Sequence, residues 1–456
     1  MSGLEAGQRT RPRSGEELEL TIDRLAYGGA GVARTDGYVV FVRGAVPGDR
    51  VRARVTKSKR SFAEADTLEL LEPSPDRVEP VAPHPGAPWQ VLPYERQLAE
   101  KEAQVRDALE RIGRFEGPPV EPIVPALEQL HYRNKLEYSF GEDDDGELVL
   151  GFHRPGRFDV IDAVPEDILA SERVDEMRSA VGDWCRAEGL TAWDRRAQSG
   201  LLRNLVVREG RRTGQLQARV VTSPGSTFRI DELAAATPAD AFLWTRADSL
   251  AETTRSGKTE VVKGSGAYLE EELSGLRFRI SPDAFFQTNT EMAERLYGEA
   301  VALAGLSGRE KVLDLFCGIG TIALAMALDA GEVGGVEIVE AAVADAIENA
   351  RLNGIDNASF FAGDVRLAMR PLLEESGRPD VVVVDPPRAG LSQKVVRRVL
   401  EAEASRIVYV SCNPTTLAPN ARQMVDAGYE LKTVRPVDMF PQTPHIECVA
   451  LLERGD

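Results

Sequence analysis

Short apolar runs alternate with helical patterns over the C-terminal part of the chain, from about Asn289 onward. Each run is long enough for one buried strand, and the segment after it spaces its apolar residues like one face of a helix. The runs read KVLDLF, GGVEI, ASFFAG, DVVVVD and RIVYV, followed by YELKTVRPVDMF and HIECVALLE. Because parallel strands need helical crossovers, the alternation predicts an α/β fold with a doubly wound parallel sheet. The last two runs predict a hairpin at one edge of that sheet.

Two β-rich regions precede this sheet. In the first, short alternating strands are separated by turn signals such as Gly28-Gly29, a pattern typical of a small OB-like β-barrel. The second also contains one helix, from about Ser171 to Glu188, and a further helix is expected from about Tyr94 to Ile112. The predicted organisation is a disordered basic tail (1–14), a barrel (15–73), a linker with a helix (74–130), a central β-rich domain (131–285) and the doubly wound domain (286–456).

The composition disfavours several classes of protein. No apolar run approaches the roughly 18–20 residues of a membrane helix, and the start lacks the apolar middle of a signal peptide. We therefore expect a cytoplasmic protein with no membrane partner, and a monomer. The four cysteines are widely separated without a CxxC pair, and the four histidines are scattered, so we expect neither a disulfide framework nor a metal site.

A run of positive charge lies within an otherwise acidic chain. The net charge is −18, yet residues 43–62 hold seven basic side chains against one acid. Such a run is either a solvated strand face or a patch that binds the phosphates of a nucleic acid, and both interpretations stay open. The seven residues are Arg43, Arg50, Arg52, Arg54, Lys57, Lys59 and Arg60.

A glycine loop and two acids point to a nucleotide-like ligand. The run KVLDLF leads into Cys317-Gly318-Ile319-Gly320-Thr321 and a helix, a turn where the backbone approaches a ligand closely. Glu337 ends the next strand and could accept hydrogen bonds from both hydroxyls of a ribose. The third glycine of a dinucleotide site is missing. The pattern DxxCGxGT followed by DPPR is instead similar to S-adenosylmethionine-dependent methyltransferases, with an ordinary α/β turn as the alternative.

Cys412 directly follows the strand RIVYV. Ligands of open α/β sheets bind beyond the carboxyl ends of the strands, so this sulfur should face the same crevice as the cofactor. A thiolate that adds to carbon 6 of a pyrimidine activates carbon 5 for methylation, and a base must then remove the carbon 5 proton. Glu447, on an apolar strand, is a candidate for that base. The alternatives are an inert buried cysteine and a structural ion pair.

Five motifs together resemble the RNA uracil-C5-methyltransferase family. They are DLFCGIGT, DPPR, SCNP, FFQTN and PHIECVALL, and the barrel segments LAYGGAGVAR and VPGDRVRARV resemble a TRAM domain, an RNA-binding barrel. The resemblance covers nearly the whole chain from about residue 16. It implies a Rossmann-like methyltransferase domain that makes 5-methyluridine in RNA, and the TRAM domain of the ribosomal members implies 23S ribosomal RNA as the substrate.

The resemblance also assigns roles residue by residue. Cys412 would be the nucleophile and Glu447 the base, acting on a uracil flipped out of folded RNA. Positions that match or fit the binding of S-adenosylmethionine are Gln287, Phe316, Thr321, Glu337, Asp364 and Asp385. Thr321 stands where some members use Asn, and Asp364 is included only for its place at a strand end. Supports for the loop and the uracil are Arg388, Ser411 and Asn413.

One departure from the family concerns iron. Many ribosomal members hold an iron–sulfur cluster on cysteines just before a stretch like WQVLPYERQLAEK, where this chain has His84 and Ala87. The segment AVPEDILASE, where a fourth ligand is expected, has no cysteine either. We therefore expect no cluster.

Three other functions are alternatives to methylation of a ribosomal uridine. One is methylation of a T-loop uridine in tRNA. Another is methylation of cytosine, disfavoured because no cysteine accompanies Asp385-Pro386-Pro387. The third is a non-enzymatic RNA-binding or folding factor that keeps the methyltransferase fold.

Overall fold

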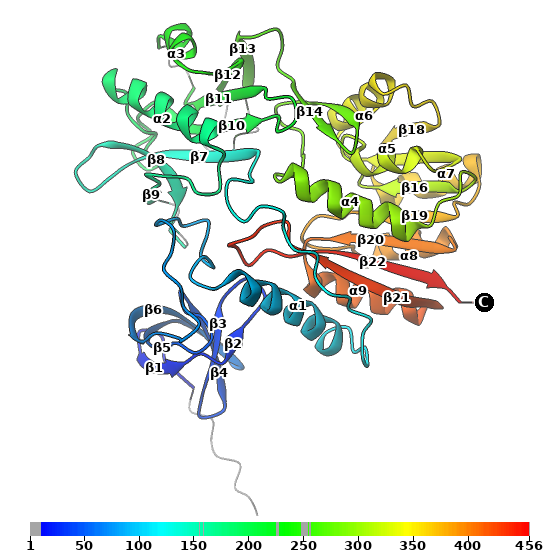
Figure 1. Cartoon of the computed structure of the whole chain (residues 1–456), viewed down its shortest axis with the longest axis horizontal. Coiled ribbons are helices and arrows are strands. Elements are labelled where there is room, and N and C mark those ends of the chain that lie inside the picture. The colour runs from blue at the N-terminus through cyan, green and yellow to red at the C-terminus, as the bar shows by residue number, and fades with distance from the viewer. Residues whose placement is uncertain are drawn as a thin grey trace, which may run out of the picture.

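The computed structural model describes residues 11–154, 156–157, 159–224, 228–247, 254 and 257–455. They form three lobes: a strand-rich N-terminal lobe, a central lobe and an α/β lobe that holds the C-terminal strands (Figure 1). Residues 1–10 of the predicted tail lie outside the described residues. Arg11, in its described part, lies against the first lobe, where its Nε donates to Ser58 Oγ at 2.8 Å. None of the helices within the described ranges is long and apolar enough to cross a membrane.

The first lobe is a six-stranded sheet in the order β1-β5-β6-β4-β3-β2. Its strands alternate between buried apolar and exposed polar residues, as along β5, where Val51, Ala53 and Val55 point into the core between arginines that point outward. This confirms the predicted N-terminal strand region. The strands are β1 (Glu17–Thr21), β2 (Arg24–Leu25), β3 (Gly31–Thr35), β4 (Tyr38–Arg43), β5 (Arg50–Ser58) and β6 (Phe62–Glu72).

The central lobe is a seven-stranded sheet in the order β13-β12-β11-β10-β7-β8-β9, with α2 and α3 packed on one face. Ser171 caps α2 by accepting from Val174 N, so the predicted helix is confirmed to within a residue at each end. The elements are β7 (Lys135–Glu142), β8 (Leu148–His153), β9 (Ile161–Ala163), α2 (Glu172–Ala187), β10 (Leu202–Glu209), β11 (Leu216–Thr222), α3 (Ile230–Ala236), β12 (Ala241–Arg246) and β13 (Lys258–Lys263). The sequence patterns did not predict β9, α3 or β13.

The α/β lobe contains the predicted doubly wound sheet. Its order is β18-β17-β16-β19-β20-β22-β21, with the first five strands parallel and β22 and β21 forming the predicted antiparallel hairpin at one edge. The strand order reverses between β16 and β19, and ligands of such sheets bind at that point. The strands are β16 (Lys311–Leu315), β17 (Glu332–Glu337), β18 (Ala358–Ala362), β19 (Val381–Val384), β20 (Arg406–Ser411), β21 (Tyr429–Val437) and β22 (Glu447–Arg454).

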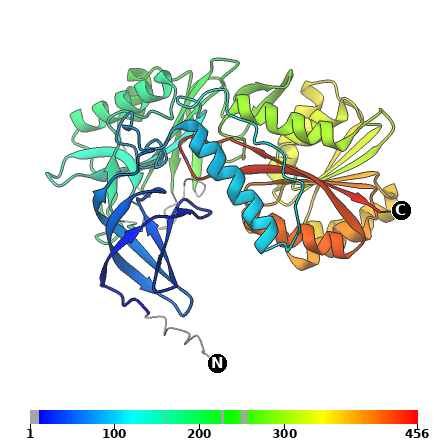
Figure 2. The same ribbon diagram turned by 60° about the horizontal axis from the view of Figure 1, so that its bottom comes forward.

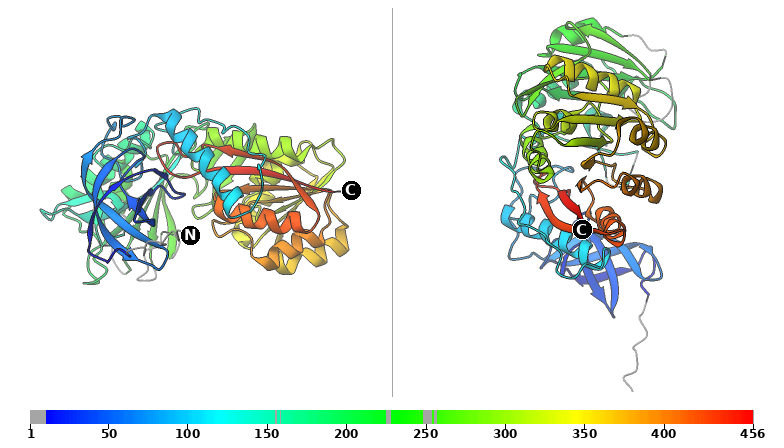
Figure 3. Two further views of the ribbon diagram at one scale, coloured as in Figure 1. Left: turned by 90° about the horizontal axis from the view of Figure 1, so that it is seen from below. Right: turned by 90° about the vertical axis from the view of Figure 1, so that its right-hand side faces the viewer.

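Helices cover both faces of this sheet. One face packs against α4, α5 and α6 together with the hairpin β14–β15, which belongs to the range predicted for the central domain. The other face packs against α7, α8, α9 and also α1, which comes from the predicted linker region and lies beside α9 (Figure 3). These elements are α1 (Tyr94–Arg111), β14 (Leu269–Leu273), β15 (Leu276–Ile280), α4 (Thr290–Ala304), α5 (Thr321–Ala327), α6 (Glu340–Leu352), α7 (Val365–Ser376), α8 (Gln393–Glu401) and α9 (Pro414–Asp426).

Helix α1 joins the first lobe to the α/β lobe. It runs from beside the N-terminal sheet along the α/β lobe (Figure 2), and Arg24 of β2 forms an ion pair with its Asp107 at 2.8 Å. Its Gln97 side chain donates to Gln442 Oε1 at 2.7 Å and accepts from the Gln442 backbone at 2.9 Å. Because Gln442 lies just before β22, the helix holds the approach to that strand.

Candidate functional site

The glycine loop lies between β16 and α5, beside the reversal of strand order. Gly318 and Gly320 have φ values of 55° and 87°, and Gly320 precedes the first turn of α5. Phe316 has a φ of 71°, a conformation that costs energy for a residue with a side chain. Its backbone N–H donates to Val336 O at 2.9 Å, so the neighbouring strand holds the strained turn in place.

A pocket opens at this loop. Of the predicted cofactor residues, Phe316, Thr321 and Asp385 line it. Tyr297, which the sequence patterns did not single out, also lines it from α4, and the Thr321 hydroxyl lies 3.4 Å from the Tyr297 hydroxyl. Phe285, 61% exposed, forms part of the rim. The pocket is therefore lined by aromatic rings, hydroxyl groups and a carboxyl group.

Glu337 and Asp364 lie beside the pocket. Glu337, at the end of β17, accepts from the N–H of Gly318 at 3.3 Å and from Val339 N at 2.8 Å, so its carboxylate is anchored against the glycine loop. Asp364 caps α7 and forms an ion pair with Arg366, which lowers the pKa of the Asp364 carboxyl to about 2. The structure brings Glu337 to the loop, whereas the Asp364 carboxylate is held by its own helix.

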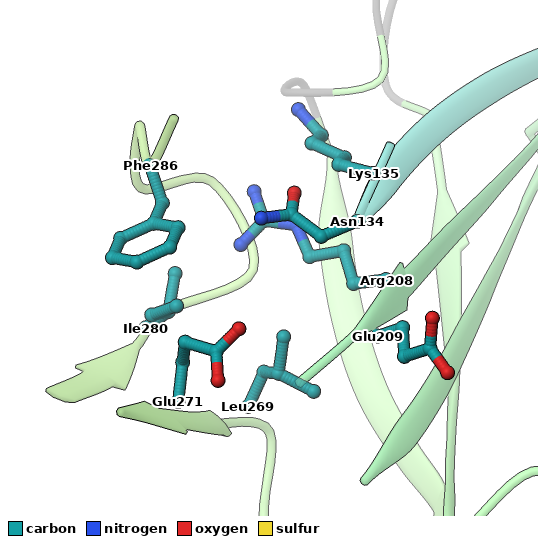
Figure 4. Close-up of a pocket in the computed structure, with 8 residues that line it drawn as sticks. All are labelled: Asn134, Lys135, Arg208, Glu209, Leu269, Glu271, Ile280 and Phe286. Atoms are coloured by element: carbon teal, nitrogen blue, oxygen red, sulfur yellow. The ribbon is translucent and has the colours of Figure 1, made fainter. Parts of the chain in front are cut away.

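Gln287 is placed by a buried joint between the central sheet and the α/β lobe. The backbone carbonyl of Gln287 accepts from Asn134 Nδ2 at 2.9 Å, and the Asn134 side-chain amide also donates to Thr290 Oγ1 at 2.8 Å. Figure 4 shows Asn134 beside Arg208 and opposite Glu271 and Phe286, around a small cavity. The Gln287 side chain is buried near Tyr297, which lines the pocket, but Gln287 is not itself among the lining residues.

Two carboxyl groups are buried near the pocket. Asp314, on β16, is only 1% exposed, and its carboxylate lies near the backbone N–H of Ala323 without a well-formed hydrogen bond to any residue that the structure describes. Burial, together with the charge of Asp385, raises the pKa of Asp314 well above its usual range. Burial also raises the pKa of Asp385 to about 7. Both groups would be stabilised as anions by a positive charge in the pocket.

Cys412 and Glu447 lie near each other where β20 ends and β22 begins. The register pairs Ser411, the last residue of β20, with Cys448, so Cys412 and Glu447 each directly adjoin this pair, and the charge of Glu447 acts on the Cys412 thiol. Cys412 is half-buried, whereas Glu447 is 4% exposed. The backbone ladder therefore brings together two residues that are 35 positions apart in the sequence.

Glu447 and Asp385 both influence the ionisation of Cys412. Burial, followed by the charges of Glu447 and Asp385, raises the pKa of the Cys412 thiol to about 12, and the Arg388 guanidinium opposes this. Burial and the charge of Asp385 raise the pKa of Glu447 well above its usual range. When it is ionised, such a carboxylate is a strong base.

The loop after Cys412 is held by its own side chains. Ser411 Oγ accepts from Asn413 N at 3.2 Å and donates to Asn413 O at 3.1 Å. Asn413 caps α9, and its Nδ2 donates to the carbonyl of Arg388 at 2.9 Å. The guanidinium of Arg388 lies 3.5 Å from His445 Nδ1. The three predicted support residues therefore gather around Cys412.

The predicted basic patch in the first lobe is largely paired. The arginines on β5 face acids on the flanking strands β1 and β6, for example Arg52 with Glu69 at 2.5 Å and Arg54 with Glu17 at 2.8 Å. The other ion pairs are Arg43 with Asp66, Arg50 with Glu19 and Glu72, Arg52 with Glu17, and Lys57 with Glu64. Within the described ranges, Lys59 and Arg60 form no ion pair.

The positions considered for a cluster ligand lie in a buried hydrogen-bond network. His84 Nε2 lies 2.9 Å from Asp167 Oδ1, and the Tyr138 hydroxyl donates to Asp167 Oδ2 at 2.8 Å. Ala87 packs nearby in an apolar cluster. The part of the chain that the structure describes contains no group of three or more His, Cys, Asp or Glu side chains arranged to hold a metal.

The sequence patterns missed Asp314 and Tyr297. An acid inside the apolar run KVLDLF is the same signal that singled out Glu447, and it could have identified Asp314. Tyr297 lies within an ordinary amphipathic helix and carries no signal that separates a pocket residue from a core residue.

The sequence matches two known protein families. Residues 252–455 match the family described as tRNA (Uracil-5-)-methyltransferase, and residues 12–68 match the TRAM domain. A relative in Chlorobaculum tepidum, described as an uncharacterized RNA methyltransferase, is 40% identical over 98% of this chain and 99% of its own length. A second one, in Halalkalibacterium halodurans, is 38% identical over 98% of this chain and 99% of its own.

A solved structure is also similar over nearly the whole chain. It is the tRNA (uracil-54, C5)-methyltransferase of Pyrococcus abyssi in complex with S-adenosyl-L-homocysteine. The TM-score is 0.78 and the sequence identity 28%, over 95% of this chain and 100% of that one.

Proposed function

Because the chain belongs to the family of S-adenosylmethionine-dependent RNA uracil-C5-methyltransferases, we propose that it methylates carbon 5 of one uridine through a covalent adduct on Cys412. The observation that supports this proposal is the proximity of Cys412 and Glu447 to each other and to Asp385, which lines the pocket at the glycine loop. A nucleophile and a strong base are the two groups that methylation of a pyrimidine carbon requires.

The charge of the pocket suits S-adenosylmethionine. The buried carboxylates of Asp314 and Asp385 and the rings of Phe316 and Tyr297 favour a ligand that carries a positive charge. Anchored Glu337 would accept hydrogen bonds from the ribose, and Gln287 and Thr321 would lie at the other end. Asp364 stays a proposal for an adenine contact, because its carboxylate now pairs with Arg366.

In the proposed reaction, the thiolate of Cys412 forms a bond to carbon 6 of the uracil, and the electrons of the C5–C6 double bond move onto carbon 5 and the neighbouring carbon 4 carbonyl. S-adenosylmethionine would supply the methyl group that carbon 5 takes up and would leave as S-adenosylhomocysteine. Glu447 then removes the carbon 5 proton, the C5–C6 double bond re-forms, and the bond from carbon 6 to sulfur breaks, which frees Cys412. Arg388, Ser411 and Asn413 hold the loop and the ring in place.

The nature of the RNA is a separate proposal. The TRAM domain, which the ribosomal members of the family share, predicts 23S ribosomal RNA as the target. The Pyrococcus abyssi enzyme, which aligns over 95% of this chain, is described as acting on tRNA, and this observation favours a T-loop uridine as a second candidate. Methylation assays with a transcribed tRNA and a 23S fragment separate the two. Cytoplasmic location and a monomeric state stay predictions.

We also propose that the protein works without an iron–sulfur cluster. In the region where cluster ligands would be expected, His84 and Tyr138 instead form hydrogen bonds with Asp167. Iron analysis and the visible absorption spectrum of protein purified without oxygen test this proposal, and stoichiometric iron would contradict it.

The adduct itself is the direct test of the mechanism. RNA that carries 5-fluorouridine cannot lose the group at carbon 5, so the wild-type protein should form a covalent complex that survives denaturing electrophoresis. Cys412→Ser should form none, while Cys185→Ser, which changes a buried cysteine of the central lobe, should behave as wild type. No complex with the wild-type protein on either RNA would contradict the mechanism.

A further inference from the structure

A tyrosine of the N-terminal lobe contacts the nucleophile loop. Tyr27 lies in the turn between β2 and β3, and its hydroxyl donates to the backbone carbonyl of Cys412 at 3.1 Å. Its ring packs against the apolar core of the α/β lobe. The two residues are 385 positions apart in the sequence. Part of the TRAM domain therefore reaches the residue proposed as nucleophile.

This contact completes the anchoring of one peptide unit. The Cys412 carbonyl accepts from Tyr27, and the N–H at the other end of the same peptide, that of Asn413, donates to Ser411 Oγ at 3.2 Å. A peptide plane that is bonded at both ends cannot rotate without breaking one of the bonds. Because rotation of this plane changes ψ of Cys412, the two bonds together fix the backbone that directs the thiol.

The same turn also packs against the segment that leads to Glu447. A Cβ atom on Gly29 would lie 2.9 Å from Pro444 Cβ and 3.2 Å from Trp89 Nε1, so the turn and the segment are in close contact. Trp89 in turn donates through its backbone to Gln442 O at 3.0 Å. One turn of the N-terminal lobe thus touches both chain segments that carry the proposed nucleophile and base.

We propose that Tyr27 is a positioning residue for the reaction, and that the turn formed by residues 26–30 is a structural part of the catalytic site. The effect of Tyr27 on kcat rests on the proposed function, whereas the contact between Tyr27 and Cys412 does not. Tyr27 acts through the Cys412 peptide, not on the uracil. A TRAM domain that only bound RNA would influence affinity, whereas this one also sets the orientation of the thiol.

Tyr27→Phe tests the inference because it removes the hydroxyl and keeps the ring that packs against the core. Tyr429→Phe is a matched control, since the Tyr429 hydroxyl also donates to a backbone carbonyl, that of Ala404 at 2.8 Å, at the other end of the sheet. The loss of one hydrogen bond should lower kcat about five- to tenfold in Tyr27→Phe, with the KM for RNA within about twofold of wild type. Tyr429→Phe should keep both values.

A second measurement uses the free protein without RNA or methyl donor. Iodoacetamide should alkylate Cys412 several-fold faster in Tyr27→Phe, because the half-buried thiol is no longer held, and at the wild-type rate in Tyr429→Phe. Peptide mass spectrometry identifies the modified cysteine. Unchanged alkylation in Tyr27→Phe would overturn the inference, as would a higher KM at an unchanged kcat. If the wild-type protein methylates no RNA, the proposed function fails, while the alkylation rates still decide whether Tyr27 positions the loop.

Discussion

Lys101 of α1 and Asp438, between β21 and β22, form an ion pair of 2.5 Å in which both side chains are fully buried. The ammonium also donates to Phe440 O at 3.0 Å, and the Tyr94 hydroxyl donates to the other oxygen of Asp438 at 2.8 Å. The pair fastens α1 to the chain that enters β22. The pair lies outside the pocket and stabilises the segment that leads to Glu447.

Asp438→Asn should destabilise the protein by about 3 kcal/mol, because it leaves the Lys101 ammonium buried without its counter-charge. Lys101→Met combined with Asp438→Asn should recover part of that loss, since no charge then stays buried. Urea unfolding of the two single variants and the double variant measures the coupling. Additive losses would mean that the two side chains do not interact.

Alkylation of Cys412 should depend on pH through Asp385. Burial and nearby charges raise the pKa of the thiol to about 12, so its rate with iodoacetamide should rise about tenfold per pH unit between pH 8 and 10, where Asp385 is already ionised. Asp385, whose pKa is about 7, is ionised at pH 9 and then holds the thiol protonated. Asp385→Asn should therefore react faster at pH 9 and equally at pH 6, where Asp385 is already neutral. Equal rates at pH 9 would show that the two groups are not coupled.

Glu447→Gln should separate bond formation from release. The amide cannot accept the carbon 5 proton, so Cys412 should still attack while the adduct with ordinary RNA accumulates. Turnover should fall by at least about a hundredfold, which is the usual contribution of a general base. Denaturing gels of the reaction and mass spectrometry of the RNA check this. Rapid turnover by Glu447→Gln would assign the proton to another group.

Two adjacent glycines allow the lobe contact to be tested by stability. Gly28 and Gly29 have φ values of 89° and 88°, so alanine costs about 1 kcal/mol at either position. Only at Gly29 would the new methyl group meet Pro444 and Trp89, whereas at Gly28 no atom of the described residues lies within 4 Å of the added carbon. Gly29→Ala should lose about 1–3 kcal/mol more in chemical unfolding than Gly28→Ala. Equal losses would mean that the lobes can separate at no cost.

Whether the arginines of β5 bind RNA can be tested by removing an acid that pairs with one of them. Glu69→Gln removes the carboxylate 2.5 Å from Arg52 and leaves only its 3.8 Å pair with Glu17, so affinity for RNA should increase about two- to fivefold if this face contacts phosphates. Asp36→Asn, in the turn between β3 and β4, removes an equal charge elsewhere in the lobe and should change affinity less. Filter binding at two salt concentrations measures both. Equal effects would favour the solvated strand face.

Some features follow from local pattern and others depend on three-dimensional pairing. The doubly wound sheet, the helix that begins after Ser171 and the convergence of Cys412 and Glu447 could be predicted, because strand ends and caps obey local rules. The charge pairing on β5 depends on the cross-strand register, and so could not. The strand β14, LEEEL, was missed because its buried Glu271 is satisfied by distant groups, the N–H groups of Arg211 and Arg212.

The contact of Tyr27 with Cys412 could not be predicted either, because no sequence pattern near one of these residues indicates the other. It has a consequence for protein engineering. A TRAM barrel grafted from a relative to retarget the enzyme would have to supply a hydroxyl of the same reach and a glycine at position 29. Grafts chosen for RNA affinity alone would give chimaeras that capture their new substrate and turn it over slowly.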